Sequence, residues 1–364
     1  MSHKMERFLF KIHYSTSMAM DILILNNVPI ESGIGRYVYN LYVSLKSENI
    51  RIINFANYSE YKNKTFVGDI VKPNYKNSTI NILLRNIYNR KILKEIYTHK
   101  GIVHYTSNLM PVYKSKAIKI GTVHDFFAFE HKNLQKWDFI YASYVIKHSN
   151  RILNLDNIIV TTNLYKTKLF ESYKYNGNAF VVPYAISDNF TVIKDKKALR
   201  KDLNLPVDKI LILSVSDSSP HKNLNILPRV MKLLGDNYSL VRVGEQVGES
   251  ITFPFADYIL INKIYNACDI LVYPSIAEGF GFPMIEAFAT GLPVVASDIP
   301  VFHEVGGDVP IFVNNVNPES IAEGIKTAYA NREKLSTKGL ERAKIYSLDA
   351  LKDNMTKVYS KILK

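Results

Sequence analysis

The sequence is poor in cysteine and in long apolar runs, and both shortages narrow the classes of protein to consider. The lone Cys268 among 364 residues excludes an internal disulfide framework and a zinc site built from cysteines. No run of about 18 uncharged apolar residues occurs, so a membrane-spanning helix is not expected. Apolar residues make up 47% of the chain and charged residues 22%, which excludes wholesale disorder. At about 100–200 residues per domain, the length predicts two domains.

The first half of the chain is also short of acidic residues. Residues 1–190 hold 25 Lys and Arg against 13 Asp and Glu, whereas residues 191–364 hold 21 against 20. Such a positive field attracts phosphates, whether on nucleic acid, on anionic lipid or on a phosphorylated ligand. The sequence has no RNP-type aromatic motif, no recognition-helix signature and no zinc spacing, so nucleic acid is not an expected partner.

Short apolar strands alternate with helices in two series, which predicts an α/β protein with two doubly wound, Rossmann-like domains. The strands of the first series are expected at residues 20–26, 51–55, 102–105, 118–123, 157–161 and 179–182, with a helix at 37–46. Those of the second series are expected at residues 210–215, 239–244, 270–273 and 293–297. Ligands of such sheets bind at the carboxyl ends of the strands, so a cleft between the two domains is the expected site.

We place the first domain at residues 1–190, the second at 191–345, and a closing amphipathic helix within 346–364. Residues 1–17 precede the first clear strand. We expect them to be an appendage or the product of an upstream start. Their apolar patch is too short for a signal peptide, so the expected location is the cytoplasm.

The densest motif is the stretch EGFGFPMIEAF at residues 278–288, directly after a strand. Pro283 suits the first turn of a helix. Gly279 and Gly281 let backbone amides approach a ligand closely. The amides of Met284 and Ile285 are then predicted to face a phosphate at the positive end of the helix.

Two carboxylates, Glu278 and Glu286, bracket this motif and are good acceptors for the hydroxyl groups of a sugar or a ribose. The motif therefore suits a ligand that carries both a polyol and a phosphate. No Asp-x-Asp sequence occurs in the chain. We therefore expect no metal and no other cofactor, with Lys222, backbone amides and Arg36 meeting the charge of the phosphate.

The stretch at residues 273–297 resembles the glutamate–seven residues–glutamate motif of the retaining GT-B glycosyltransferases of family four (glycosyl transferases group 1). Four further segments resemble motifs of that family, in the family's order. They are a glycine loop at residues 32–37, a histidine–aspartate pair at 122–125, a lysine loop at 214–225, and a C-terminal segment at 346–364 that crosses back onto the first domain.

The resemblance implies a hexosyltransferase that moves a hexose from a nucleoside diphosphate sugar with retention of anomeric configuration. It implies catalytic roles for Lys222 at the diphosphate, Glu278 at the hexose and His124 beside the reacting sugar. The implied donor-binding residues are Gly33, Gly35, Arg36, Gly279, Phe280, Gly281, Phe282, Met284, Ile285 and Glu286, with Glu286 on the ribose.

The implied partners are a GDP- or UDP-linked hexose and a glycan or lipid-linked acceptor. The lysine loop departs from the family pattern at Asp217, where an arginine is usual five residues before Lys222. His221 or Arg36 would have to compensate for this acidic residue. The loop at residues 244–262 is shorter than is common, which leaves the nucleotide open.

Three other functions stay open: a sugar-nucleotide epimerase with the same architecture, a glycosyltransferase-like binding protein without activity, and a basic nucleic-acid-binding protein. The lysine loop and the paired glutamates favour transfer over epimerisation. Asp217 is the best indication of lost activity.

A basic helix is expected at residues 79–100, with Arg85, Arg90, Lys91 and Lys94 on its charged side. It is either an ordinary core-facing helix or a docking face for an anionic membrane, which would make the protein peripheral to that membrane.

Overall fold

A computed structural model describes residues 20–26, 33–45, 49–54, 66–69, 90–108, 110–126 and 151–364. Residues 1–17, Ser32 and residues 79–89 of the helix expected at 79–100 lie outside the described residues. Of that helix, the structure describes α3, Arg90–Thr98.

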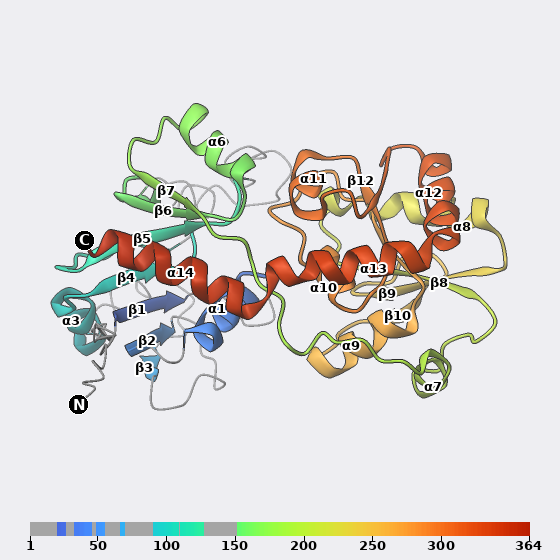
Figure 1. Ribbon diagram of the computed structural model, residues 1–364, viewed down its shortest axis with the longest axis horizontal. Coiled ribbons are helices and arrows are strands. Elements are labelled where there is room, and N and C mark those ends of the chain that lie inside the picture. Colours follow the sequence, from blue (N-terminus) through green and yellow to red (C-terminus); the bar gives the residue numbers. More distant parts are fainter. Residues whose placement is uncertain are drawn as a thin grey trace, which may run out of the picture.

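In the part of the chain that the structure describes, the first sheet has seven parallel strands in the order β3-β2-β1-β4-β5-β6-β7 (Figure 1). The strands are β1 Asp21–Asn26, β2 Asn49–Asn54, β3 Phe66–Asp69, β4 Ile102–Tyr105, β5 Ile118–Val123, β6 Asn157–Val160 and β7 Asn178–Val181. Besides α3, the described helices here are α1 Gly33–Ser44 and α6 Asn163–Glu171. Strands such as β1 and β4 are buried nearly throughout, which explains their unbroken apolar sequence.

The second sheet has six parallel strands in the order β10-β9-β8-β11-β12-β13. They are β8 Ile210–Val215, β9 Tyr238–Val243, β10 Ile251–Phe253, β11 Ile270–Tyr273, β12 Val294–Ser297 and β13 Ile311–Val313. Helices surround it: α7 Lys196–Asp202, α8 Leu227–Leu234, α9 Tyr258–Ala267, α10 Phe282–Ala289, α11 Pro300–Gly306, α12 Pro318–Ala330 and α13 Arg332–Ala343. The predicted α/β fold with two doubly wound sheets is thus confirmed.

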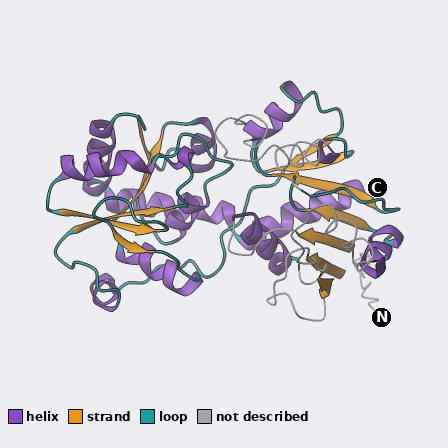
Figure 2. Cartoon of the chain, turned by 180° about the vertical axis from the view of Figure 1, so that it is seen from behind, coloured by secondary structure: helices purple, strands orange, loops and turns teal. Residues whose placement is uncertain are grey.

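The two sheets lie on either side of the predicted domain boundary at residues 190 and 191, and they form two separate lobes in Figures 1 and 2. The sequence analysis missed β3, β10 and β13. These strands have only three or four residues each, and they form three of the four sheet edges. An apolar pattern of that length is too short to predict a strand.

Within residues 151–364, all of which are described, the chain crosses between the lobes twice, and the two crossings are hydrogen-bonded to each other. Ile186 in the first crossing donates its amide to the Tyr346 carbonyl in the second, at 2.7 Å. After the second crossing, α14, Leu348–Ile362, lies along α1 in the first lobe (Figure 1). Tyr359 of α14 hydrogen-bonds its hydroxyl to His104 Nδ1 of β4, at 2.7 Å. The predicted closing helix therefore returns to the first lobe.

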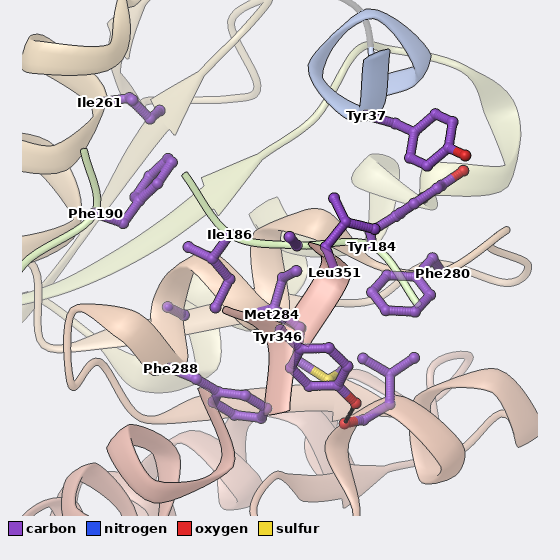
Figure 3. Packing of buried hydrophobic residues seen from close by; sticks show 14 of the residues in the cluster. Tyr37, Tyr184, Ile186, Phe190, Ile261, Phe280, Met284, Phe288, Tyr346 and Leu351 are labelled. Atoms are coloured by element: carbon purple, nitrogen blue, oxygen red, sulfur yellow. Dashed lines mark hydrogen bonds between the residues drawn. The ribbon is translucent and has the colours of Figure 1, made fainter. Parts of the chain in front are cut away.

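One apolar core runs through both lobes by way of the crossings. Figure 3 shows Tyr37 of α1, Tyr184 of the first crossing, and Phe280 and Met284 of the second lobe within the same packed cluster. The Tyr346 side chain belongs to this cluster and donates to the Val305 carbonyl at 2.7 Å. Because the cluster is continuous, the two lobes are held against each other by burial as well as by chain connection.

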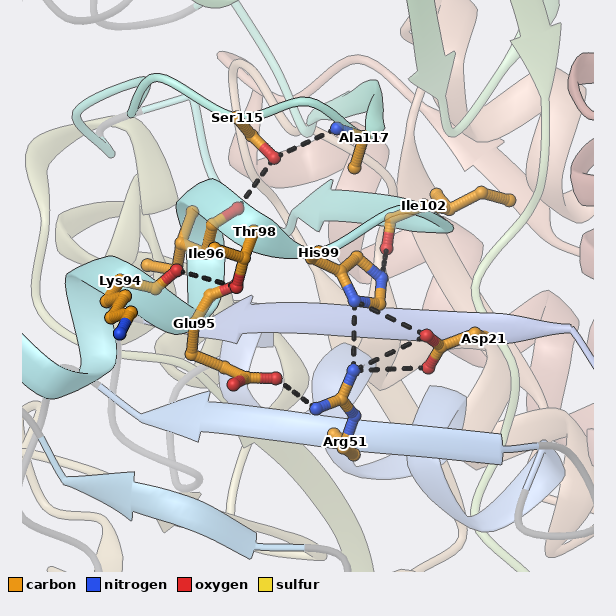
Figure 4. Close-up of polar contacts among 10 residues, drawn as sticks. All are labelled: Asp21, Arg51, Lys94, Glu95, Ile96, Thr98, His99, Ile102, Ser115 and Ala117. Atoms are coloured by element: carbon orange, nitrogen blue, oxygen red, sulfur yellow. Dashed lines mark hydrogen bonds and ion pairs between the residues drawn. The ribbon is translucent and has the colours of Figure 1, made fainter.

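A polar cluster fastens α3 to the first sheet close to the start of β1 (Figure 4). Arg51 of β2 contacts Asp21 at 3.3 Å, Glu95 of α3, and His99 Nδ1 at 2.9 Å. His99 Nε2 bonds the Ile102 carbonyl at 3.1 Å, so this nitrogen carries the proton and Nδ1 accepts from arginine. The cluster lies at the amino end of the sheet, away from the ends where ligands bind, and its role is structural.

The buried His104 predicts a pH-dependent loss of stability. Burial lowers the pKa of His104 to about 3, from the ordinary 6.5. Because the folded-state pKa is the lower one, unfolded chains take up the proton first as the pH falls below 6.5. The contribution of neutral His104 to the unfolding free energy is complete above pH 6.5. It is lost as the pH falls toward 3, at up to about 1.4 kcal/mol per pH unit.

We expect His104→Gln, which cannot titrate, to flatten the dependence of the unfolding free energy on pH between 6 and 4. Urea denaturation at each pH, with His303→Gln as the exposed control, measures the slopes. Parallel slopes for wild type and His104→Gln would contradict the assignment.

Candidate active site

A cavity of about 940 Å³ lies between the two lobes. Its walls are the segments that follow strand ends of both sheets: the start of α1, the residues after β5, and those after β8, β9, β10 and β11. The carboxyl ends of the two parallel sheets therefore face the same space, as the sequence predicted for the ligand site.

Lys222 lies on this wall because a short loop after β8 is tied to the loop after β11. The loop turns through Asn223, whose φ of 55° is left-handed. The Asn223 side chain donates to the carbonyls of Pro274 at 3.3 Å and Asn315 at 2.7 Å. Ile276 donates its amide to the His221 carbonyl at 2.7 Å. These bonds bring the lysine loop to the glutamate motif.

Lys222 and Glu278 meet at 2.7 Å, and both side chains are largely buried. Ser275 donates its hydroxyl to the same carboxylate oxygen, also at 2.7 Å. A charge-assisted contact of this kind is strong, and it fixes the ammonium group at the cavity wall. Lys222, which is predicted to bind the diphosphate, and Glu278, which is predicted to bind the hexose, are thus adjacent.

Gly279 permits a close approach between the lobes, and Gly281 permits a close approach within the second lobe. A Cβ on Gly279 would lie 3.2 Å from the His124 carbonyl and 3.2 Å from Asp125 Cβ. Gly281 has a φ of 114° and would place a Cβ 3.1 Å from the Phe302 ring. Across the junction between the lobes, Tyr165 of α6 donates to the Glu278 carbonyl at 2.6 Å. The glutamate motif is therefore bound directly to the first lobe.

Aromatic side chains form part of the cavity wall beside the glycines. Phe282 stacks on Tyr184 with ring centres 4.5 Å apart, and Phe280 lies 4.8 Å from the same ring. Gly33 lies opposite Phe282, and a Cβ there would be in ordinary contact with that ring. This places the predicted residues Gly33, Phe280 and Phe282 together at the cavity.

Arg36 and Glu286 form an ion pair between the lobes, at 2.6 Å. The Glu286 side chain is 2% exposed and accepts a second hydrogen bond, from Tyr265 at 2.8 Å. Glu286 raises the pKa of Arg36, and burial followed by the Glu286 charge raises the pKa of Tyr265. Arg36 and Glu286 are both predicted to bind the donor, but in the structure they bind each other.

His124 lines the cavity with both ring nitrogens already bonded to the protein. Nε2 lies 2.6 Å from the Thr106 carbonyl, so this nitrogen donates, and Nδ1 accepts from Tyr184 at 2.5 Å. Burial lowers the pKa of His124 to about 4, so the ring is neutral at pH 7. A neutral, fixed ring can position a sugar by contact, while proton transfer would require one of these bonds to break.

Four predicted residues do not line the cavity: Gly35, Met284, Ile285 and the buried Glu286. The amides of Met284 and Ile285 both donate to the Gly281 carbonyl, at 3.1 and 3.5 Å, and both side chains are fully buried. The expectation that they face a phosphate is therefore wrong for this structure, because the first turn of α10 closes on itself. Gly35 is buried within α1, whereas its neighbours Ile34 and Arg36 line the cavity.

Asp217 lies at the cavity edge with its carboxylate turned into its own loop. The side chain accepts the Ser219 amide at 2.8 Å. Desolvation raises the pKa of Asp217, but the hydrogen bonds of Ser219 and the charge of Lys222 outweigh it, so the pKa lies below its usual value. The carboxylate therefore stays charged and adds negative potential to this edge.

The sequence analysis missed several groups that complete the site. They are Tyr265, which donates to Glu286, Tyr184, which donates to His124, and Ser275, which donates to Glu278. Each lies on a separate element, so no local sequence motif predicts them. Phe255 lines the cavity mouth while remaining 67% exposed.

Within the ranges that the structure describes, no three His, Cys, Asp or Glu side chains are grouped so that they could hold a metal ion. None of the described helices is both long and apolar enough to span a membrane.

Residues 195–344 match the family described as glycosyl transferases group 1. The O-antigen chain mannosyltransferase RfbU of Salmonella typhimurium is 27% identical over 283 residues, which are 71% of this chain and 74% of RfbU. The O-antigen biosynthesis glycosyltransferase WclY of Escherichia coli is 26% identical over 176 residues, 45% of this chain and 48% of WclY.

Two solved structures share the fold across nearly the whole chain. A sucrose-phosphate synthase from Thermosynechococcus elongatus has a TM-score of 0.75 at 17% identity and covers 94% of this chain and 99% of its own. Anabaena HepE, in complex with UDP-glucose, has a TM-score of 0.72 at 16% identity and covers 94% of this chain and 100% of its own.

The ion pair between the lobes predicts strong coupling in a double-mutant cycle. Arg36→Met leaves the buried Glu286 carboxylate with Tyr265 alone, and we expect the unfolding free energy to fall by about 3 kcal/mol. Arg36→Met combined with Glu286→Gln should recover most of that loss, because no buried charge is left unpaired.

Chemical denaturation measures the cycle. The exposed pair of Lys263 and Asp202, at 2.8 Å, is the control, and Lys263→Met should cost less than about 1 kcal/mol. Additive effects of Arg36→Met and Glu286→Gln would show that the pair does not hold the lobes.

Proposed function

We propose that this chain, a GT-B glycosyltransferase whose second lobe belongs to the glycosyl transferases group 1, transfers a hexose from GDP- or UDP-hexose to a glycan or lipid-linked acceptor. The transfer retains the anomeric configuration and needs no metal ion. The observation that carries the proposal is the cavity between the lobes, where Lys222 and Glu278 are in contact and Arg36 and Glu286 lie alongside.

Donor cleavage leaves negative charge on a nucleoside diphosphate, and a fixed cation is the group that stabilises it. Lys222 is held at the wall by Glu278, so little reorganisation is needed when the charge develops. As the diphosphate takes over the ammonium group, Glu278 keeps the Ser275 bond and gains free acceptor oxygens for the hydroxyl groups of the hexose. One pair thus serves both halves of the donor.

Glu286 suits the ribose hydroxyl groups once Arg36 has moved from it. The exchange replaces an ion pair with two hydrogen bonds to the carboxylate and frees the Arg36 guanidinium for the phosphate or the sugar. Because Arg36 belongs to the first lobe and Glu286 to the second, donor binding would change the contact between the lobes. The nucleobase would lie toward Phe255 and Tyr258 at the mouth of the cavity.

Lys222→Met is expected to lower kcat/KM for the donor by about a hundredfold or more, because it removes the fixed cation and leaves Glu278 unpaired. Glu286→Gln should weaken donor binding by about tenfold. A panel of GDP- and UDP-linked hexoses, mannose and glucose among the sugars, identifies the donor by calorimetry and turnover.

In the same assay, NMR of the first product reports the anomer, and a chelator tests the need for metal. Retention with turnover unchanged in chelator is expected. An inverted product, or turnover lost in chelator and restored by Mg²⁺ or Mn²⁺, would overturn the mechanism. Epimerised sugar nucleotide without transfer would favour the epimerase alternative, and salt-dependent nucleic-acid binding without donor binding would favour the nucleic-acid alternative.

An anionic membrane is the proposed surface for a lipid-linked acceptor, and the described part of α3 supports it. Four lysines are exposed around the end of this helix: Lys94, Lys100, Lys114 and Lys116. Tyr97, which is 48% exposed, lies beneath the Lys116 ammonium group, 5.6 Å from it. Each lysine near an anionic surface contributes about 1 kcal/mol, so four together support reversible binding.

Changing these four lysines to Gln should abolish co-sedimentation with anionic vesicles and leave donor turnover in solution unchanged. Changing the exposed second-lobe lysines Lys197, Lys232, Lys326 and Lys334 to Gln is the control for net charge. Equal pelleting of both variants, or pelleting with neutral vesicles, would show that α3 is ordinary scaffold.

A further inference from the structure

Arg242 is a fully buried arginine behind Ser216 and Gly244, two residues of the cavity wall that we call the cavity floor. It belongs to β9, and its side chain is 0% exposed. Its side-chain hydrogen bonds go to the end of β8, to the turn that follows β8 and to its own strand. Nη1 donates to the carbonyls of Ser214 at 3.1 Å and Val243 at 2.9 Å, and Nη2 donates to the Ser216 carbonyl at 2.6 Å, the Ser216 hydroxyl at 3.2 Å and the Asp217 carbonyl at 3.4 Å.

This cation is buried without a direct carboxylate partner among the described residues. Its Nε has no hydrogen-bond partner in the described part of the chain. Burial lowers the pKa of Arg242 to about 10, against the more distant charges of Asp217 and Glu245, so the side chain is still protonated at neutral pH. A buried charge without a counter-ion is unfavourable, and an apolar residue would fill this position of a buried strand at lower cost.

The Arg242 guanidinium lies against two residues that line the cavity, Ser216 and Gly244. Gly244 has a φ of 124°, and a Cβ there would lie 3.1 Å from Arg242 Nη2 and 2.3 Å from the Ser216 carbonyl. Glycine therefore keeps this part of the floor thin, and the positive charge acts across it.

The charges that line the cavity explain what this cation would do. Among the described residues that line the cavity, two cations, Arg36 and Lys222, face four carboxylates: Asp125, Asp217, Asp257 and Glu278. Both cations are already paired, with Glu286 and with Glu278. A nucleoside diphosphate entering the cavity would meet a net negative wall unless another positive charge lies near its path.

We propose that Arg242 is a positioning residue for the donor, which fixes the turn at residues 214–217 and supplies the positive potential that draws the diphosphate to the cavity floor. The inference rests on the proposed function and deepens it. It also resolves the acidic Asp217 of the lysine loop: the positive charge comes from the neighbouring strand, below the turn, rather than from the turn itself.

The test uses the full-length protein and measures binding of GDP and UDP by calorimetry. Arg242→Met keeps the length of the side chain and removes the charge. We expect it to weaken binding of the nucleoside diphosphate by about tenfold to a hundredfold and to reduce the dependence of binding on salt. Arg242→Lys should retain most of the affinity.

Arg200→Met is the matched control. Arg200 is also a buried arginine of the second lobe, bonded to three carbonyls and to Asp269, at a place that does not line the cavity. Its loss should lower the melting temperature as Arg242→Met does, but leave diphosphate affinity within about twofold of wild type.

A rescue separates charge from structure. Asp217→Arg combined with Arg242→Met restores a cation at the same turn, and we expect it to recover at least a few-fold of the lost affinity. A purely structural role for Arg242 would give no rescue. If Arg242→Met does not fold, Asp217→Asn carries the test, because removing the opposing charge should tighten diphosphate binding several-fold without touching the core.

Unchanged affinity in both Arg242→Met and Asp217→Asn would overturn the inference while leaving the proposed function intact. Absence of GDP and UDP binding to the wild type would instead overturn the proposed function, and this inference with it.

Discussion

The site depends on the way the two lobes are fastened together. The chain passes between them twice, the crossings share the hydrogen bond from Ile186 to Tyr346, and one apolar core runs through the junction. This arrangement turns the carboxyl ends of two parallel sheets toward one space. Residues far apart in sequence, such as Arg36 and Glu286, then become direct partners.

The site is preorganised by pairs of opposite charge that the donor would have to rearrange. Lys222 rests on Glu278, and Arg36 rests on Glu286. Each pair keeps a reactive group dehydrated and in place without ligand, and each releases a carboxylate for hydroxyl groups when phosphate takes the cation. Arg242 differs because its partners are carbonyl groups and one hydroxyl group, so its charge remains available to the cavity.

The sequence predicted the α/β class, most strands and the glutamate motif, because these rest on local patterns: apolar runs of four to six residues, and glycine and proline next to a helix start. It could not predict that Met284 and Ile285 turn away, because that depends on how the first turn of α10 closes on Gly281. It also missed Arg242, since a single arginine in a strand has the pattern of an exposed position. The position of Arg242 beside the cavity becomes evident only from its contacts with Gly244 and with the turn after β8.

A structure of the protein with bound nucleoside diphosphate, solved by crystallography, tests the central claim most directly. The account predicts the diphosphate between Lys222 and the turn above Arg242, with the ribose hydroxyl groups on Glu286 and the Arg36 guanidinium displaced from that carboxylate. A nucleotide bound elsewhere, or bound in the cavity with the pairs of Arg36 with Glu286 and of Lys222 with Glu278 both unchanged, would contradict it.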